Sequence, residues 1–354
     1  MAKLPPRLAE HPSVRAVLDR RASEAPKPQV IDAEWLRKLC LEAGADDVGF
    51  VSLDHPDLAS EREPVLNALP GTRSLVSLVG RMNRENVRSP ARSVANQEFH
   101  RGAEVLNEVA HRVVRALEDT GHRALNPAVA FPMEMDRYPG RIWVVAHKPV
   151  AVAAGMGAMG IHRNVIHPRF GNFILLGTLL LDAEISEYGT ALDYNPCLEC
   201  KLCVAACPVG AIAKDGAFDW AACATHNYRE FMGGFEDWVG TVVESGDTDA
   251  YRERVTASES ASMWQSLAFK PNYKAAYCLA VCPAGEDVLE PYLSNRKDFM
   301  DTVLKPLQEK VETLYVVPGS PAGDHARRRF PHKPVKEVRN GLPGTRPRQE
   351  EKDG

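Results

Sequence analysis

Seven of the eight cysteines in this 354-residue chain lie between positions 197 and 282, at spacings that could bind iron. The first four form the run Cys197-Leu-Glu-Cys200-Lys-Leu-Cys203-Val-Ala-Ala-Cys207-Pro208. This C-x2-C-x2-C-x3-C-P spacing wraps the backbone around one iron–sulfur cubane and directs the fourth cysteine to a second cluster. Structural zinc sites use pairs of C-x2-C instead, so the run favours iron–sulfur chemistry.

A shorter motif returns near the end of the cysteine segment. Cys278 and Cys282 are separated by three residues and followed by Pro283, and Cys223 lies between the two motifs. In two-cluster bacterial ferredoxins, the last cysteine of each motif crosses to the other cluster. The expected ligands of the first cluster are therefore Cys197, Cys200, Cys203 and Cys282.

The second cluster is one thiolate short. Its expected ligands are Cys207, Cys223 and Cys278, because Ala275 stands where a full C-x2-C-x3-C-P motif has its first cysteine. Two interpretations stay open: the cluster has three irons, or its fourth iron takes a non-cysteine ligand. His226, three residues after Cys223, is one candidate ligand, although a single histidine is more often a structural hydrogen-bonding group.

The composition is that of an ordinary globular protein. Apolar residues make up 44% of the chain and charged residues 25%, and the net charge of −4 argues against a surface built wholly for nucleic acid. No apolar run reaches the roughly 18 to 20 residues of a membrane span. No apolar stretch follows the pair Arg20-Arg21, so we expect no export signal and a cytoplasmic location, where thiols stay reduced.

The elements that must position the cysteines alternate between helix and strand, which is typical of an α/β layered domain. The periodicity predicts helices over 32–43, 98–121, 149–155 and 292–314, and strands over 47–52, 74–80, 142–146, 164–167 and 173–181. Cys40, outside the cluster segment, falls on the first helix as a buried apolar residue. The expected divisions are an N-terminal arm over 1–30, the α/β domain over 31–190, a two-cluster module over 191–290, and a helix with a basic tail over 291–354.

A glycine-rich loop lies between the α/β segment and the cysteines. It contains Gly155, Gly157 and Gly160, which permit backbone conformations and close approaches that a Cβ would block. The loop could therefore lie against a large planar ligand, although ordinary tight turns use glycine in the same way. It does not follow the first strand of a Rossmann unit, so a dinucleotide is a poor match.

The order of these parts resembles the cobalamin-dependent reductases, namely the reductive dehalogenases and the epoxyqueuosine reductases. The resemblance rests on the early strand Ala45-Asp46-Asp47-Val48-Gly49-Phe50, the glycine loop 154–160, the segment 167–177 and the cluster motifs. It implies a nitroreductase-like domain that binds base-off cobalamin, followed by a ferredoxin-like module with two 4Fe-4S clusters. The missing cysteine at Ala275 leaves the second as either a 3Fe-4S cluster or a cluster with a non-cysteine ligand. The residues that it places near the corrin are Gly157, Gly160, His162, Gly171 and Asn172.

Neither activity of this group transfers residue by residue. Where the dehalogenases have a catalytic arginine, this chain has Ile174-Leu175-Leu176. Where the epoxyqueuosine reductases have a catalytic aspartate, an ungapped match places Arg141. The nearest proton donors are Asp136, Tyr138 and His147, each of which could protonate a carbanion or a leaving oxygen and each of which is also common as a structural group.

The expected function is a cobalamin-dependent, dehalogenase-like iron–sulfur reductase that acts on a small organic substrate. A ferredoxin, a flavodoxin or a flavin reductase would deliver electrons to the second cluster, from which they pass to the first cluster and the cobalt. One alternative is an epoxyqueuosine reductase acting on tRNA, less favoured because only about 70 residues follow Pro283, where those enzymes carry a helical-repeat extension. The other is a non-catalytic electron carrier.

Overall fold

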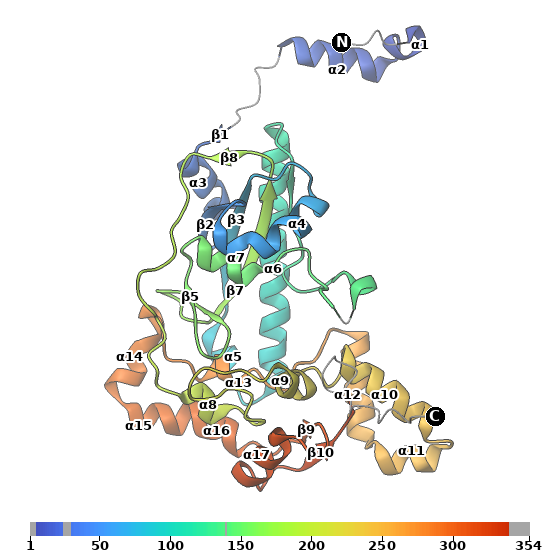
Figure 1. Cartoon of the computed structure of the whole chain (residues 1–354), viewed down its shortest axis with the longest axis vertical. Helices are drawn as coiled ribbons and strands as arrows, with labels where there is room; N and C mark the ends of the chain where they lie inside the picture. Colours follow the sequence, from blue (N-terminus) through green and yellow to red (C-terminus); the bar gives the residue numbers. More distant parts are fainter. Residues whose placement is uncertain (1–4, 24–29, 139, 340–354) are drawn as a thin grey trace, which may run out of the picture.

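The computed structural model describes residues 5–23, 30–138 and 140–339 of the chain (Figure 1). Its centre is a four-stranded sheet in the order β2-β3-β7-β4, in which every neighbouring pair is antiparallel. The strands are β2 (Asp47–Ser52), β3 (Ser74–Arg81), β7 (Ile174–Leu181) and β4 (Ala124–Leu125). The fold is thus a mixture of helices and strands, as the sequence predicts, with an antiparallel sheet.

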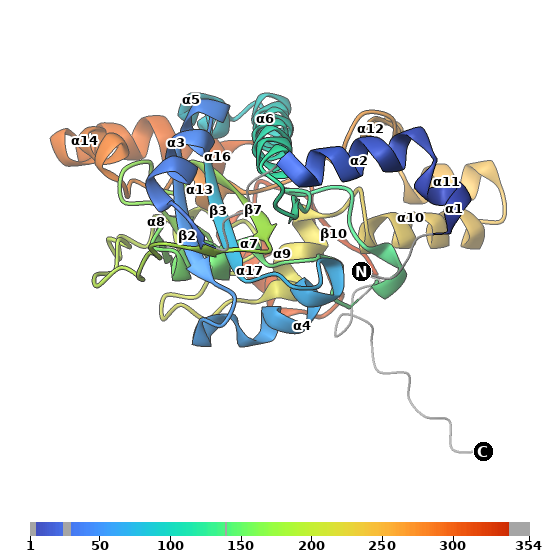
Figure 2. The same ribbon diagram turned by 90° about the horizontal axis from the view of Figure 1, so that it is seen from above.

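Helices cover both faces of this sheet, with one pair lying above the strands and the other below them in Figure 2. One pair is α3 (Ala33–Ala43) and α6 (Arg92–Asp119), and the other is α4 (Ala59–Ala68) and α7 (His147–Ala153). Successive residues of a strand point to opposite faces. Accordingly Phe50 packs in the core under α3 and α6, whereas Val51 packs in the core under α7.

Helix α6 connects the sheet to the cysteine segment. Its second half packs Leu106, Val113 and Leu117 against the strands, and its first half extends toward α5 (Arg84–Arg88) and α13 (Tyr277–Ala280) (Figure 1). The periodicity predicts a start at Glu98, but the helix begins six residues earlier. The first turns of the helix are polar, so apolar periodicity cannot reveal them. They are held by polar contacts such as those between the Asn96 side chain and the Tyr273 backbone.

The cysteine motifs lie on or beside two short helices that pack together, α8 (Leu202–Ala206) and α13 (Tyr277–Ala280). Leu202 and Ala206 of α8 share a buried core with Tyr277 and Ala280 of α13. Cys223 lies on a third helix, α9 (Trp220–Asn227). Between α9 and α13 the chain forms α10 (Gly233–Glu244), α11 (Thr248–Arg254) and α12 (Ala257–Ala268).

Three small strand pairs complete the described sheets. Two of them are parallel, β1 (Val30–Ile31) with β8 (Glu184–Ile185) and β9 (Leu314–Val316) with β10 (Val335–Glu337). The third is the antiparallel hairpin of β5 (Ala158–Met159) and β6 (Val165–Ile166), which contains the end of the glycine loop. The predicted strand over 164–167 is therefore a two-residue strand.

Two predicted elements are wrong. Residues 142–146 form no strand, because Arg141 and the backbone that follows it are drawn to the Glu61 carboxylate. The single helix over 292–314 is instead divided into α14 (Glu286–Ser294), α15 (Arg296–Phe299), a π-helical turn (Met300–Leu304) and α16 (Lys305–Glu309), and the predicted range ends at Leu314, the first residue of β9. Asn295 separates the first two segments by capping α15 through its side chain.

Parts of the predicted arm and of the predicted basic tail lie outside the described residues. Within the arm the structure has α1 (Pro6–Ala9) and α2 (Pro12–Ser23), and within the tail it has α17 (Pro321–Arg329) and β10. Two 3-10 turns, Pro56–Leu58 and Met135–Arg137, complete the elements. No helix of the described residues has the length and apolar character needed to cross a bilayer.

Candidate iron–sulfur centre

Four cysteines drawn from both motifs line one cavity, together with Ile161 and His162. They are Cys197, Cys200, Cys203 and Cys282. Cys203 lies on α8 and Cys282 follows α13, so the packing of these two helices brings the motifs together. The same four cysteines are those that crossed ligation assigns to the first cluster.

The other three cysteines line a second, larger cavity of about 510 Å³. They are Cys207, Cys223 and Cys278, and Ala275 and His226 belong to the same lining. The backbone N–H of Ala211 donates to Cys207 Sγ at 3.2 Å, the type of contact that stabilises a thiolate. The structure therefore separates the seven cysteines into a group of four and a group of three; that they bind clusters stays a prediction.

Thiols of one group lie close enough to repel one another as thiolates. Burial raises the pKa of Cys278 to about 12, and repulsion from Cys223 and Cys207 adds to the effect. Burial likewise raises the pKa of Cys282, with repulsion from its neighbours Cys200 and Cys203. Because neutral thiols are favoured here without a cation, iron is what would make these thiolates stable.

The arrangement suits a cluster better than a single ion. Within the described ranges, no three Cys, His, Asp or Glu side chains converge as ligands of one metal ion. A structural zinc site needs four donors around one atom, whereas a cubane spreads its thiolates over separate irons. Cysteines distributed around a cavity fit the second geometry.

The hairpin of β5 and β6 places its turn between the two cavities. Ile161 lines the first cavity, Arg163 and Asn164 line the second, and His162 lines both. The Asn164 side chain lies near the second group, with its Nδ2 3.9 Å from Cys278 Sγ. The hairpin thus connects the sheet domain to both groups of cysteines.

His162 is held as a neutral ring. Its Nδ1 accepts the Asn164 backbone N–H at 3.1 Å, so its proton lies on Nε2, 3.3 Å from the Asn172 side-chain amide. Burial, with repulsion from Lys148, lowers the pKa of His162 to about 4. If the Asn172 amide is flipped so that its oxygen and nitrogen exchange places, its oxygen accepts the His162 Nε2 proton. This orientation also gives a partner to the buried Asn172 Oδ1, which is otherwise unpaired.

The five residues nominated for the corrin do not form an open cradle. A Cβ on Gly157 would meet the Ile166 carbonyl oxygen at 2.5 Å, one on Gly160 would meet Ile166 Cδ1 at 2.8 Å, and one on Gly171 would meet the Ala284 carbonyl oxygen at 2.0 Å. The other two residues, His162 and Asn172, are buried against each other. These glycines accommodate the chain itself and do not form a surface for a corrin, so corrinoid binding stays a prediction.

The structure does not gather the three candidate proton donors around one described cavity. Asp136 is exposed and lines a cavity of about 260 Å³ with Arg141 and Trp143, whereas Tyr138 is half-buried. His147 uses both ring nitrogens, since Nδ1 lies 2.9 Å from Thr178 Oγ1 and Nε2 lies 3.0 Å from the Ala128 carbonyl oxygen. His147 therefore connects strand β7 to the 126–130 loop, and Asp136 is the accessible acid.

Arg141, which an ungapped match aligns with a catalytic aspartate, is paired with a buried glutamate. Its guanidinium makes two hydrogen bonds to the Glu61 carboxylate, at 3.1 and 2.5 Å. Glu61 is 4% exposed and also accepts the Ala146 backbone N–H at 2.8 Å. The pair fixes the 141–146 segment onto α4.

Sequence patterns missed two buried arginines that hold the second motif in place. Arg88 donates to the Ala280 carbonyl at 3.3 Å, and Arg92 donates to the Ala275 carbonyl at 2.8 Å. Burial lowers the pKa of each guanidinium, although Arg remains a cation at any physiological pH. Their partners lie more than 180 positions away, so no local signal in the sequence could reveal them.

A third missed residue, Lys148, lines the cavity of the three-cysteine group. Its Nζ donates to the Arg163 carbonyl at 2.6 Å and to Asn164 Oδ1 at 3.1 Å. It lies on α7, next to His147, where the sequence gives a lysine no distinguishing pattern. Its position brings a cation to the cavity wall.

Comparison with known proteins gives partial matches. No family model matches the chain. The epoxyqueuosine reductase of Cellulophaga algicola is 28% identical over 118 residues, which cover 30% of this chain and 38% of that protein. That of Leadbetterella byssophila is 31% identical over 118 residues, with the same coverage. The matched segment is thus well under half the length of these curated relatives.

Among solved structures, the epoxyqueuosine reductase of Streptococcus thermophilus superposes with a TM-score of 0.44 at 16% identity, covering 84% of this chain and 80% of that one. The catabolic reductive dehalogenase NpRdhA gives a TM-score of 0.46 at 16% identity, covering 77% of this chain and 34% of that one. Over the segment matched in sequence, the chain is similar to the epoxyqueuosine reductases, which supports its resemblance to this group of reductases.

Proposed function

We propose that the chain is an iron–sulfur oxidoreductase whose two clusters carry electrons to a redox centre associated with the sheet domain. The observation that supports this most is the separation of seven cysteines into two groups on either side of one hairpin turn. His162 lines both cavities, so clusters held there would be neighbours in one electron path. A ferredoxin, a flavodoxin or a flavin reductase would supply the electrons.

The substrate is proposed to be an epoxide of the epoxyqueuosine type, in a modified tRNA nucleoside. The curated relatives described above are named epoxyqueuosine reductases, which supports this alternative better than the dehalogenase activity expected from the sequence. Deoxygenation of an epoxide to an alkene consumes two electrons and two protons and releases water. Asp136, which is exposed and lines a cavity together with Arg141, is the proposed source of a proton.

Cobalamin is part of this proposal through the resemblance alone. Bound cobalamin would supply a strongly nucleophilic reduced cobalt. The nominated glycines pack against the chain's own atoms, so a corrin would have to contact other residues. Cobalt analysis of the protein purified with cobalamin supplied tests this part separately from the clusters.

Turnover by the full chain distinguishes the candidate activities. The protein would be incubated anaerobically with cobalamin, a strong reductant and tRNA that carries epoxyqueuosine, and the nucleosides would be analysed after digestion. Conversion to the deoxygenated nucleoside supports the proposal. Dehalogenation of halogenated aromatics without any conversion of the tRNA would instead support the dehalogenase activity. Electron exchange with a reductase, without conversion of either substrate, would support the electron carrier.

A further inference from the structure

The backbone of the second motif repeats that of the first at the missing ligand. Cys200 is followed by Lys201, which has φ 59° and ψ 16° and precedes α8. Ala275 is followed by Ala276, which has φ 70° and ψ 25° and precedes α13. A left-handed residue other than glycine is uncommon, so its recurrence identifies Ala275 as the structural counterpart of Cys200.

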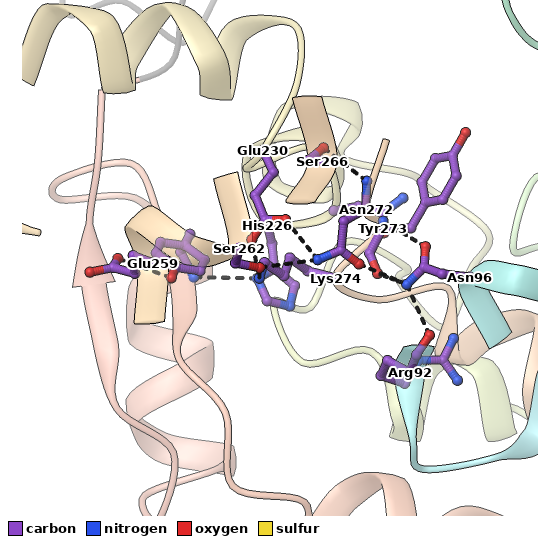
Figure 3. A network of polar contacts seen from close by, with 12 residues as sticks. Arg92, Asn96, His226, Glu230, Glu259, Ser262, Ser266, Asn272, Tyr273 and Lys274 are labelled. Atoms are coloured by element: carbon purple, nitrogen blue, oxygen red, sulfur yellow. Dashed lines mark hydrogen bonds and ion pairs between the residues drawn. The ribbon is translucent and has the colours of Figure 1, made fainter. Parts of the chain in front are cut away.

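Ala275 is held firmly at the wall of the three-cysteine cavity. Its backbone N–H donates to Asn227 Oδ1 at 2.9 Å, and its carbonyl accepts from Arg92 at 2.8 Å. Asn96 anchors the preceding segment by exchanging hydrogen bonds with the Tyr273 backbone (Figure 3). The turn of a ligand loop is thus preserved, with a methyl group where a thiolate would stand.

His226 is poorly placed to replace that thiolate. Its Nδ1 accepts the Tyr315 backbone N–H at 3.3 Å, and its ring stacks on Tyr315. A neutral ring with Nδ1 engaged as an acceptor carries its proton on Nε2, which then has no lone pair for iron. His226 Nε2 is buried and has no partner among the described residues, and the side chain lines the cavity. It therefore offers an N–H donor there.

Lys148 adds positive charge to the same cavity. Two of its three ammonium hydrogens are used by Arg163 and Asn164, which leaves one donor. A cation and a buried N–H around an incomplete set of thiolates favour an anion as the missing ligand.

We propose that the second cluster is bound by Cys207, Cys223 and Cys278 alone, and that its fourth corner opens into the cavity as a binding site for a small anion. The anion would coordinate iron through sulfur or oxygen, as a thiolate or a carboxylate does. His226 Nε2–H and the Lys148 ammonium would orient it. The inference rests on the proposed function, because it requires the cysteines to bind clusters.

The variant Ala275→Cys tests the open corner, with Ala275→Ser as a matched control that adds a similar atom without a thiolate. In the anaerobically purified full chain, mild ferricyanide oxidation should release about one iron per wild-type chain and produce the EPR signal of a three-iron cluster. Adding 2-mercaptoethanol to the reduced wild type should shift its EPR spectrum. Both responses should persist in Ala275→Ser and disappear in Ala275→Cys.

Variants of His226 separate a donor from a ligand. Gln retains an N–H group at this place, whereas Leu removes it. We expect both His226→Gln and His226→Leu to keep the wild-type iron content, and only His226→Leu to weaken the response to 2-mercaptoethanol. Loss of one iron per chain in both variants would make His226 a ligand and overturn the inference, as would a wild type that responds to neither reagent. A wild type without iron would instead overturn the proposed function.

Discussion

In the sheet domain, two of the side chains singled out from the sequence make structural contacts. Arg141, which an ungapped match aligns with a catalytic aspartate, is bound by Glu61. His147, a candidate proton donor, uses both of its ring nitrogens in structural contacts. Both side chains therefore position loops, and Asp136 is the exposed residue among the three candidate proton donors.

We expect Glu61→Gln to destabilise the fold. The change leaves the partly buried Arg141 without its counter-charge, which costs about 3 kcal/mol in the free energy of unfolding. Urea denaturation measures the effect. Glu63→Gln, two residues along α4 and exposed, is the control and should change stability by less than about 0.5 kcal/mol. Equal effects of the two substitutions would show that the Glu61–Arg141 pair contributes no more than a surface charge.

Asp47 gives a pH dependence at the residue scale. Partial burial opposes its ionisation, but hydrogen bonds from His167 and from the Val48 N–H outweigh burial and lower the pKa of the carboxyl below 3.8. A carboxyl with a lowered pKa in the folded state stabilises the protein above its unfolded pKa, and this contribution is lost as pH falls through the folded pKa.

The variant Asp47→Asn should therefore be less stable than the wild type at neutral pH, by no more than about 1 kcal/mol because the carboxyl is partly exposed. The difference should shrink as the pH falls below 3.8. Urea unfolding of both proteins over a pH series measures it. A difference that stays constant down to the lowest pH would contradict the stated role of the carboxylate.

At the scale of elements, the loop after β6 (167–173) contacts the loop that follows the last cysteine (283–287), and this contact joins the sheet domain to the end of the cysteine segment. The backbone N–H groups of Glu286 and Asp287 donate to the carbonyls of Pro168 and Arg169, both at 2.9 Å. Gly171 makes this approach possible: its φ is +64°, and a Cβ there would meet the Ala284 carbonyl oxygen at 2.0 Å. The loop after β6 thus fixes the backbone directly after Cys282 and Pro283.

Gly171→Ala should disrupt this junction, and Gly246→Ala is its matched control. Gly246 has φ +73°, but no atom lies within 4 Å of its Cβ position, so its substitution carries backbone strain alone, about 1 kcal/mol. Gly171→Ala adds the clash and should cost at least about 1 kcal/mol more in the free energy of unfolding. Thermal or urea unfolding of both variants measures the difference. Equal decreases in the free energy of unfolding would contradict the prediction, because they would mean that the contact between the two loops does not contribute to stability.

Local and long-range information differ in what they could predict. The grouping of the cysteines follows from spacing within short motifs, and the helix over 33–43 and the strands over 47–52 and 174–181 follow from apolar periodicity. The start of α6 at Arg92 and the role of Arg88 depend on backbone carbonyls far along the chain, so periodicity could not reveal them. The glycine loop is part of a hairpin, which its own residues could not reveal because the pairing partners, Val165 and Ile166, follow the loop.

At the scale of the whole molecule, the sheet domain and the cysteine helices meet along α6 and the hairpin of β5 and β6 (Figure 1). Arg88 and Arg92 come from the sheet side and bind carbonyls of the second motif, so cluster sites would form only when the two parts are docked. Iron content should therefore report on the docking as well as on the ligands.

The measurement that tests this account most directly is the iron and sulfide content of the anaerobically purified full chain, compared with Cys282→Ser and Cys278→Ser. We predict about seven or eight irons per wild-type chain. Cys282→Ser should selectively deplete the first cluster and Cys278→Ser the second, each leaving the EPR signal of the other. A wild type with less than about one iron per chain, or with zinc in its place, would contradict the central claim of two iron–sulfur clusters.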